Sequence, residues 1–211
     1  MSKVKLVCFD LNKTLIKENS WLKLNTALGM TKAEDQMLFK LWEEGSMTYK
    51  QWQDIISKIY VTRGIPTRQK IEKVLFDYEY KPYVKEVIQY LKSKDYRLAL
   101  LTGSEVSLAR RVANELGFDM YGAVNIFIYD EKDLFKDIIV LGDEEPFKLY
   151  QLNSFCFELG IKLTECACIG DGANELELFK HTKHGITFKG SKIEKSAWKV
   201  INELSDVRSF L

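Results

Sequence analysis

Residues 4–14 read VKLVCFDLNKT, a short apolar run that ends directly in an aspartate. The run is rich in strand-forming residues and too short for a helix, so it predicts a buried strand over residues 4–9. Two later stretches repeat the arrangement, RLALLTGS at 97–104 and CACIGDGANE at 166–175. Three predicted strands therefore run straight into polar residues at their carboxyl ends.

Helical periodicity fills the segments around these strands. Apolar residues recur at three- and four-residue spacing over 84–91 and 106–116, and Gly117 ends the second run. The remaining predicted elements are a hairpin of 125–129 and 138–141, a helix from about Pro146 to Gly160, a helix over 175–181 and a strand over 185–188. Strands that alternate with helices of this length predict an α/β fold, a parallel sheet with helices on both faces.

The region from residue 16 to residue 80 has a different character. Apolar and aromatic residues recur at helical spacing, and Thr-x-x-Glu and Thr-x-x-Gln capping boxes begin at Thr31 and Thr48. This pattern predicts an all-helical insertion of residues 16–80, which leaves a core of residues 1–15 and 81–211.

Composition narrows the functional class. A chain of 211 residues that is 46% apolar can bury a large core without disulfides or structural metal. The net charge of +1 provides no overall basic field for nucleic acid or anionic lipid. The four cysteines are expected to act as small hydrophobes rather than as a disulfide scaffold or zinc site. Neither a signal peptide nor a run of ~18 apolar residues is found, so we expect a cytoplasmic protein without a membrane partner.

In an open parallel sheet, ligands bind beyond the carboxyl ends of the strands, where loops and helix N-termini converge. Polar residues at these strand ends form one candidate site, together with a lysine at the start of the helix that precedes the 166–169 strand. The residues are Asp10, Asn12, Thr102, Gly103, Lys148, Asp171, Asn174 and Glu175. Paired carboxylates suit Mg²⁺, which takes one or two of them plus waters and phosphate oxygens. An amine, a hydroxyl and backbone N–H groups can take the other oxygens of a phosphoryl group.

Taken singly, Asp10, Thr102, Lys148 and Asp171 also fit plainer roles as caps, turn residues or solvated charges. Their order along the chain resembles the haloacid dehalogenase-like (HAD) hydrolases, and the Gly-Asp-Gly-Ala-Asn segment with the helical insertion resembles the phosphoserine-phosphatase-like branch. A Gly-Asp-Gly-x-Asn-Glu segment arises by chance in about one chain in several thousand. The resemblance implies a Rossmann-like three-layer core, an inserted helical cap, and a Mg²⁺-dependent phosphatase acting on a small phosphorylated metabolite.

The resemblance also implies a role for each matching position. Asp10 is expected to be the nucleophile that takes the phosphoryl group as an aspartyl phosphate. The carboxylates of Asp10 and Asp171 and the main-chain carbonyl of Asn12 are expected to hold Mg²⁺.

Further positions match the residues that surround the phosphoryl group in the family. Thr102, Gly103 and Lys148 are expected to bind and neutralise the phosphoryl oxygens, and Asn174 to assist at the same rim. Glu175 is expected to orient the metal shell from behind, where the family more often has Asp.

Position 12 departs from the family pattern, because its phosphatases carry Asp there as general acid and base. The amide of Asn12 cannot donate a proton to the leaving alcohol or accept one from water. General acid–base catalysis typically raises the reaction rate 10²–10⁴-fold, so the reaction is expected to be slow. Three readings stay open: a slow natural phosphatase, a phosphotransferase or non-hydrolysing phosphate-ligand sensor, and a deliberate Asp-to-Asn substitution that traps a complex. A dehalogenase fits less well, because metal-free halide displacement has no use for Asp171.

Substrate choice is expected to reside in the helical insertion. Phosphoserine phosphatases have a Glu nine residues after the nucleophile, whereas here that position is Asn19 with Glu18 beside it, which makes phosphoserine doubtful. Candidates to line a pocket are Trp21, Trp42, Met47, Trp52 and Arg63, although aromatic residues at helical spacing more often pack than recognise. Three C-terminal lysines at helical spacing predict a solvated face: Lys192, Lys195 and Lys199.

Overall fold

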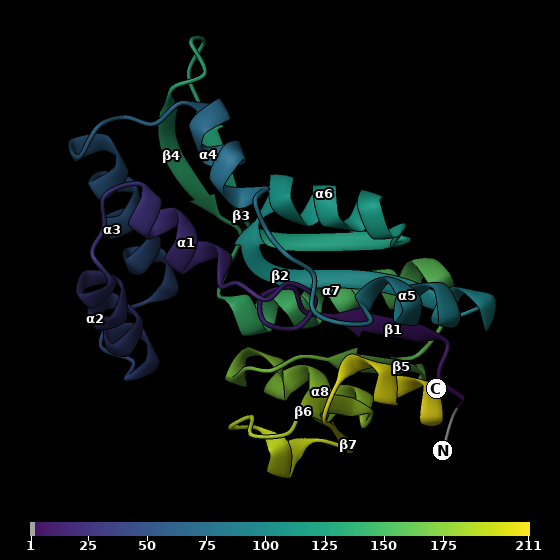
Figure 1. The fold of residues 1–211 in the computed structure, drawn as a ribbon. Helices are drawn as coiled ribbons and strands as arrows, with labels where there is room; N and C mark the ends of the chain where they lie inside the picture. The colour runs from purple at the N-terminus through teal and green to yellow at the C-terminus, as the bar shows by residue number, and fades with distance from the viewer. Residues whose placement is uncertain (1–2) are drawn as a thin grey trace.

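Seven strands form one sheet in the computed structural model, which describes residues 3–211. The spatial order is β4-β3-β2-β1-β5-β6-β7 (Figure 1). The strands are β1 (Leu6–Phe9), β2 (Arg97–Glu105), β3 (Met120–Tyr129), β4 (Phe135–Val140), β5 (Cys166–Ile169), β6 (Gly185–Phe188) and β7 (Lys199–Ile201). Adjacent strands are parallel except β3 and β4, which form the expected antiparallel hairpin. The predicted α/β fold is confirmed.

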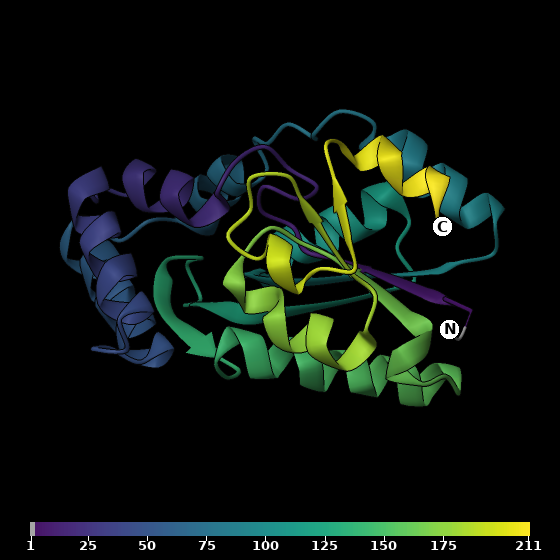
Figure 2. The ribbon, with the colours of Figure 1, turned by 90° about the horizontal axis from the view of Figure 1, so that it is seen from below.

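Helices cover both faces of the sheet (Figure 2). One face carries α5 (Val84–Ser93) and α6 (Val106–Leu116), and the other carries α7 (Glu144–Leu159) and α8 (Leu176–Thr182). Side chains of β1 alternate between the two faces, so Val7 and Phe9 pack in the α5–α6 cluster while Leu6 and Cys8 pack in the α7–α8 cluster. All four are buried because both faces are covered. None of the helices formed by residues 3–211 is long and apolar enough to cross a membrane.

Four helices follow β1 and precede α5. They are α1 (Ser20–Ala27), α2 (Lys32–Glu43), α3 (Tyr49–Thr62) and α4 (Arg68–Leu75). Each begins at a side chain that accepts a hydrogen bond from the first turn, and the capping boxes predicted at Thr31 and Thr48 are both formed. We call α1–α4 the helical unit. Of the predicted core segment 1–15, residues 1 and 2 lie outside the described residues.

The β3–β4 hairpin extends past the other strands of the sheet and packs on the helical unit (Figure 1). The Ser57 hydroxyl of α3 donates to Asp137 Oδ1 of β4 at 3.0 Å. Arg68, the first residue of α4, forms an ion pair with Asp133 in the hairpin turn at 2.8 Å. The helical unit is therefore attached to the core by this hairpin as well as by its two chain connections.

The prediction for β2 was wrong at its carboxyl end. The strand continues to Glu105, so Thr102 and Gly103 lie inside the strand rather than in a glycine turn after it. β3 begins at Met120, earlier than expected, and gives the end of β2 a pairing partner. The register shifts between Thr102 and Glu105, and such an irregularity redirects the chain at the edge of a site.

The C-terminal lysines do not lie on a helix. Lys192, Lys195 and Lys199 are exposed, as expected, but the segment forms a short 3₁₀ turn at Glu194–Ser196 and then β7. The segment joins the sheet although its lysines have helical spacing. Trp198 N donates a hydrogen bond to the Gly185 carbonyl at 2.7 Å, and β7 pairs with β6.

Close packing of β6 on α8 supplies a stability test. A Cβ added at Gly185 would lie 2.1 Å from Cγ of the buried Phe179 ring, which has no room to move. Gly185→Ala should lower the free energy of unfolding by about 1–3 kcal/mol, measured by urea denaturation. Gly122→Ala in β3 is the control and should cost less, because its nearest neighbours, Leu101 Cδ2 and Gln151 Cγ, lie farther away, at 2.9 and 3.2 Å. Equal losses would contradict this account.

Candidate active site

Asp10 lies at the carboxyl end of β1 and is 6% exposed. Its backbone N–H donates to the Ile169 carbonyl of β5 at 2.9 Å, which fixes the chain as it leaves the sheet. Oδ1 accepts a hydrogen bond from Lys148 Nζ at 2.8 Å. Burial raises the pKa of the Asp10 carboxyl to about 6, against the charge of Lys148, which lowers it.

Lys148 comes from the second turn of α7 and its side chain is fully buried. Nζ lies 2.8 Å from Asp10 Oδ1, 2.5 Å from Glu175 Oε1 and 3.1 Å from Glu144 Oε1. Burial alone would lower the pKa of Lys148, but the surrounding carboxylates raise it well above its usual value. One ammonium among three carboxyl groups leaves excess negative charge, an arrangement that favours a bound cation.

The segment between β5 and α8 carries three of the predicted residues, Asp171, Asn174 and Glu175. A Cβ at Gly170 would lie 2.4 Å from Glu175 Cγ, so the glycine leaves room for Glu175 to reach Lys148. Burial raises the pKa of Glu175 to about 8, against the charge of Lys148. Asp171 is partly exposed; burial raises its pKa, whereas three neighbouring lysines lower it.

The Gly103 carbonyl is held by three donors. It accepts hydrogen bonds from Trp21 Nε1 at 3.0 Å, from the Tyr49 hydroxyl at 3.2 Å and from Asn125 Nδ2 at 2.8 Å. Trp21 and Tyr49 belong to the helical unit, so these bonds join it to the core beside Asp10. Thr102, the residue before Gly103 in β2, is fully buried. Its hydroxyl oxygen accepts a hydrogen bond from Ser104 N at 3.0 Å.

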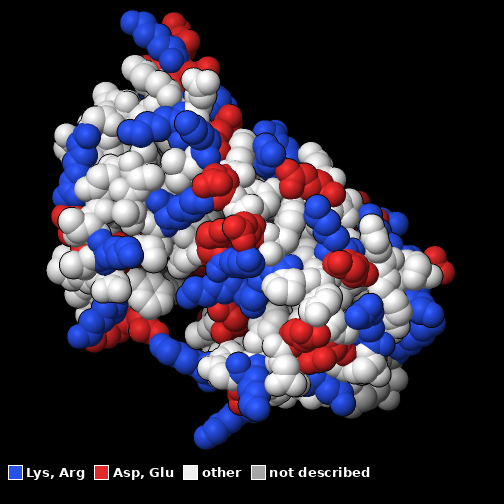
Figure 3. Space-filling view, in the orientation of Figure 1, with Lys and Arg blue, Asp and Glu red and all other residues white. Residues whose placement is uncertain are grey.

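A cleft of about 720 Å³ separates the helical unit from the core, a size typical of small-molecule sites. Figure 3 shows a notch between the helical unit, at left, and the core, with charged side chains around it. Five of the predicted residues line the cleft: Asp10, Asn12, Gly103, Asp171 and Asn174. The other three are buried nearby: Thr102, Lys148 and Glu175. The strand ends thus bring the predicted residues together, and their individual roles stay predictions.

The helical unit contributes an aromatic wall to the cleft. Predicted Trp21, Trp42 and Trp52 line it, together with Phe39 and Tyr49. Asn19 lines it too, but its side-chain oxygen caps α1 by accepting hydrogen bonds from the N–H groups of residues 21 and 22.

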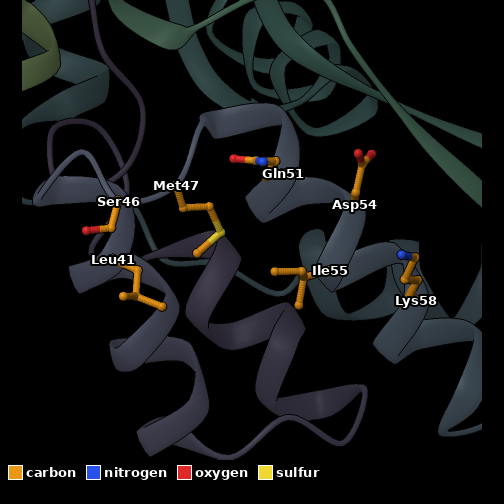
Figure 4. A pocket seen from close by; sticks show the side chains of 7 residues that line it. All are labelled: Leu41, Ser46, Met47, Gln51, Asp54, Ile55 and Lys58. Atoms are coloured by element: carbon orange, nitrogen blue, oxygen red, sulfur yellow. The ribbon is translucent and has the colours of Figure 1, made fainter.

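Two of the pocket candidates, Met47 and Arg63, do not line this cleft. Met47 lines a separate hollow of about 370 Å³ between α2 and α3 (Figure 4). Arg63 forms an ion pair with Glu34 at 2.6 Å and does not line the cleft. Helical spacing shows which residues share a face of a helix, but it does not show which of those faces meets the core.

Glu144 was missed in the sequence, although it lines the cleft. It lies four residues before Lys148 on α7, and its carboxylate accepts a hydrogen bond from Asn174 Nδ2 at 2.5 Å. The available signal was the i,i+4 spacing of an acid and a lysine, which places both on one face of a helix. Tyr49 was also missed, because its bond to Gly103 joins segments 54 residues apart.

The side chains fit a magnesium ion. Among residues 3–211 no group of three or more His, Cys, Asp or Glu side chains converges as a ligand set. Mg²⁺ does not need one, because it is held by one or two carboxylates with waters and substrate oxygens. Asp10 and Asp171 line the same cleft, and the charge of Asp171 contributes to the raised pKa of Asp10.

A family profile described as haloacid dehalogenase-like hydrolase matches residues 4–181. The chain belongs to this family. The phosphoserine phosphatase of Methanocaldococcus jannaschii is 25% identical over 209 residues, which cover 99% of this chain and 97% of the relative. The phosphoserine phosphatase of Streptococcus thermophilus is 25% identical over 221 residues, which cover 98% and 99%.

Solved structures of this HAD branch share the fold. A phospho-aspartyl intermediate analogue of phosphoserine phosphatase superposes with a TM-score of 0.85 at 23% identity over the whole of both chains. A phosphoserine phosphohydrolase-like protein from Francisella tularensis superposes with a TM-score of 0.72 at 19% identity, covering 99% of this chain and 100% of the other. The predictions of the phosphoserine-phosphatase-like branch and of a phosphoric monoester hydrolase are confirmed.

Removing the buried ammonium should make stability strongly pH-dependent. In metal-free Lys148→Met, the pKa values of Asp10 and Glu175 should rise above about 6 and 8, so the folded state binds protons that the unfolded chain does not hold. Stability then falls as pH rises: we expect a loss of about 3–5 kcal/mol at pH 8 and a smaller one at pH 5, by denaturant unfolding in EDTA.

The control is Lys180→Met, which removes an exposed lysine 3.3 Å from Glu177. It should change stability by less than about 1 kcal/mol at either pH. A loss in Lys148→Met that is equal at pH 5 and pH 8 would contradict the charge argument.

Proposed function

We propose that this protein is a Mg²⁺-dependent phosphatase that hydrolyses a small phosphomonoester through an aspartyl phosphate on Asp10. The observation that carries the proposal is the position of Asp10 on the cleft, hydrogen-bonded to the buried Lys148 at 2.8 Å, with Asp171 on the same cleft. The family assignment supports the same chemistry.

Asp10 is the nucleophile. Its carboxylate oxygen attacks phosphorus, the bond between phosphorus and the ester oxygen breaks, and the alcohol leaves with that electron pair. Water then attacks the phosphorus of the aspartyl phosphate, which releases inorganic phosphate and regenerates the carboxylate. The Lys148 hydrogen bond holds one carboxylate oxygen in place and favours the charged, reactive form of Asp10.

Asp10, Asp171 and the main-chain carbonyl of Asn12 would hold Mg²⁺. When bound, the ion neutralises phosphoryl oxygens and lowers the barrier to attack by an anionic nucleophile. The excess negative charge around Lys148 supports this part of the proposal.

Lys148, Thr102, Gly103 and Asn174 would bind the phosphoryl oxygens. Lys148 supplies an ammonium group, and Asn174 supplies an amide N–H that points at the Glu144 carboxylate. Glu175 acts on Lys148 rather than on substrate, since its carboxylate lies 2.5 Å from Nζ.

Asn12 is expected to slow the reaction. Its side-chain oxygen accepts a hydrogen bond from Ser20 N at 2.8 Å, so the amide is held at the entrance to the helical unit. It cannot protonate a leaving alkoxide or take a proton from the attacking water, and both steps are slowed as a result.

Residues 16–80 would act as a cap that selects the leaving group. The cap side of the cleft is aromatic, and Asp35 and Glu43 of α2 also line it. Asn19 itself provides no carboxylate, and its oxygen is used in capping α1, so among the described residues of the cap a substrate ammonium group could pair only with Asp35 or Glu43. We therefore place the substrate among small phosphomonoesters, and position 19 lacks the carboxylate that phosphoserine phosphatases have there.

Turnover of p-nitrophenyl phosphate tests the nucleophile and the metal. Its phenolate leaves without protonation, so the wild-type protein should release it in Mg²⁺ while Asp10→Asn should not. Asp171→Asn should weaken Mg²⁺ binding, measured by isothermal titration, because the site loses one of two carboxylate ligands. Asp77→Asn, an exposed position, is the control and should match wild type in both assays. Release by Asp10→Asn at the wild-type rate would overturn the proposal.

Asn12→Asp tests the proton-transfer position. The new carboxylate can still accept the hydrogen bond from Ser20 N and adds an acid and base, so turnover of alkyl phosphates should rise about 10²-fold. The phosphorylation step with p-nitrophenyl phosphate should gain much less. With Asn12 present, a hydroxylamine-sensitive phosphoenzyme should accumulate and be visible by intact mass.

Asn19→Asp is the matched control, since it adds the same charge to the same cleft and still caps α1. It should leave phosphoenzyme accumulation at the wild-type level, because it adds no acid or base at position 12. If Asn12→Asp changes neither turnover nor the phosphoenzyme level, position 12 is not the proton-transfer site.

A further inference from the structure

Glu144 holds the groups that the proposed function assigns to the phosphoryl group. Its Oε1 lies 3.1 Å from Lys148 Nζ and accepts a hydrogen bond from Asn174 Nδ2 at 2.5 Å. The side chain is 13% exposed and lines the cleft. Two of the four proposed phosphoryl-binding residues are therefore engaged by a carboxylate of the protein itself.

The same carboxylate lies directly over Gly103. A Cβ built at Gly103 would be 2.2 Å from Glu144 Cδ and 2.3 and 2.5 Å from its two oxygens. The carboxylate thus fills the space above the glycine, where a phosphoryl group held by Lys148, Asn174 and the Gly103 backbone would have to place its oxygens. Two anions cannot share that volume, and their charges repel.

Glu144 is placed so that it can leave. It occupies the first turn of α7, where a carboxylate is favoured by the helix dipole, and its backbone does not depend on the side-chain position. A change of side-chain rotamer moves the carboxylate into the open cleft without unfolding the helix.

We propose that Glu144 is an internal competitor of the phosphoryl group, and this proposal rests on the proposed function of the site. The carboxylate occupies the phosphoryl position in the free protein and must be displaced by every ligand. A bare phosphate ion, which has no other contacts, is held weakly for that reason. A substrate that also fills the aromatic side of the cleft gains the binding energy that displaces Glu144, so the residue raises selectivity for the leaving group and limits inhibition by the phosphate product.

The test is the affinity for inorganic phosphate in Mg²⁺, measured by isothermal titration. Glu144→Gln keeps the size of the side chain and removes its charge, so phosphate should bind about tenfold tighter than to wild type, equal to about 1.4 kcal/mol. Glu144→Ala removes the carboxylate altogether and should bind phosphate at least as tightly. Turnover of p-nitrophenyl phosphate should show a lower KM without a higher kcat.

Glu145→Gln is the matched control. Glu145 is the next residue in the same helical turn, its carboxylate accepts a hydrogen bond from Glu177 N, and it does not line the cleft. The substitution removes the same charge from the same helix N-terminus, and phosphate affinity should stay within about twofold of wild type.

Unchanged, weaker or undetectable phosphate binding in both Glu144 variants would overturn the proposal. Equal tightening in Glu145→Gln would also overturn it, because the effect would then come from charge at a distance. The proposed function is tested separately, by p-nitrophenyl phosphate release from Asp10→Asn. The phosphate titration does not depend on turnover, so the two proposals can fail independently.

Discussion

The buried ammonium of Lys148 is the interaction on which the rest of the site depends. A lysine leaves water only when its charge is balanced, and here carboxyl groups from three separate elements balance it. Asp10 follows β1, Glu144 begins α7, and Glu175 closes the loop after β5. The lysine therefore ties together the three segments that carry the chemistry. It also accounts for Gly170, because a side chain there would block the path of Glu175 to the lysine.

The cluster holds three carboxyl groups for one ammonium, so carboxyl groups remain in excess after the lysine charge is balanced. Burial raises the pKa of Asp10 and of Glu175, so keeping both carboxylates charged costs free energy in the absence of ligands. A divalent cation relieves that cost where the carboxylates meet the cleft. The same charge that destabilises the empty pocket therefore increases its affinity for a metal ion.

Much of the fold followed from local patterns. The apolar run of β1, the capping boxes of α2 and α3, and the glycine that ends α6 are short-range features, and each appears as expected. The extension of β2 through Thr102 and the pairing of β7 with β6 depend on neighbours far along the chain, and both escaped prediction. The residues of the site were likewise predictable where each ends a strand. Glu144 carried one local signal, its i,i+4 spacing to Lys148, but only the folded arrangement places it over Gly103. Tyr49 carried none, because it reaches Gly103 from the helical unit.

The attachment of the β3–β4 hairpin to the helical unit limits how the cleft can open. A cap joined by two linkers alone can swing as a rigid lid about a hinge. Here the contacts of α3 with β4 and the pair of Arg68 with Asp133 form a third tether between the helical unit and the core. Rotation of the whole helical unit would have to strain or break that tether. Ligand exchange is therefore better served by small local shifts within the helical unit than by rotation of the whole unit.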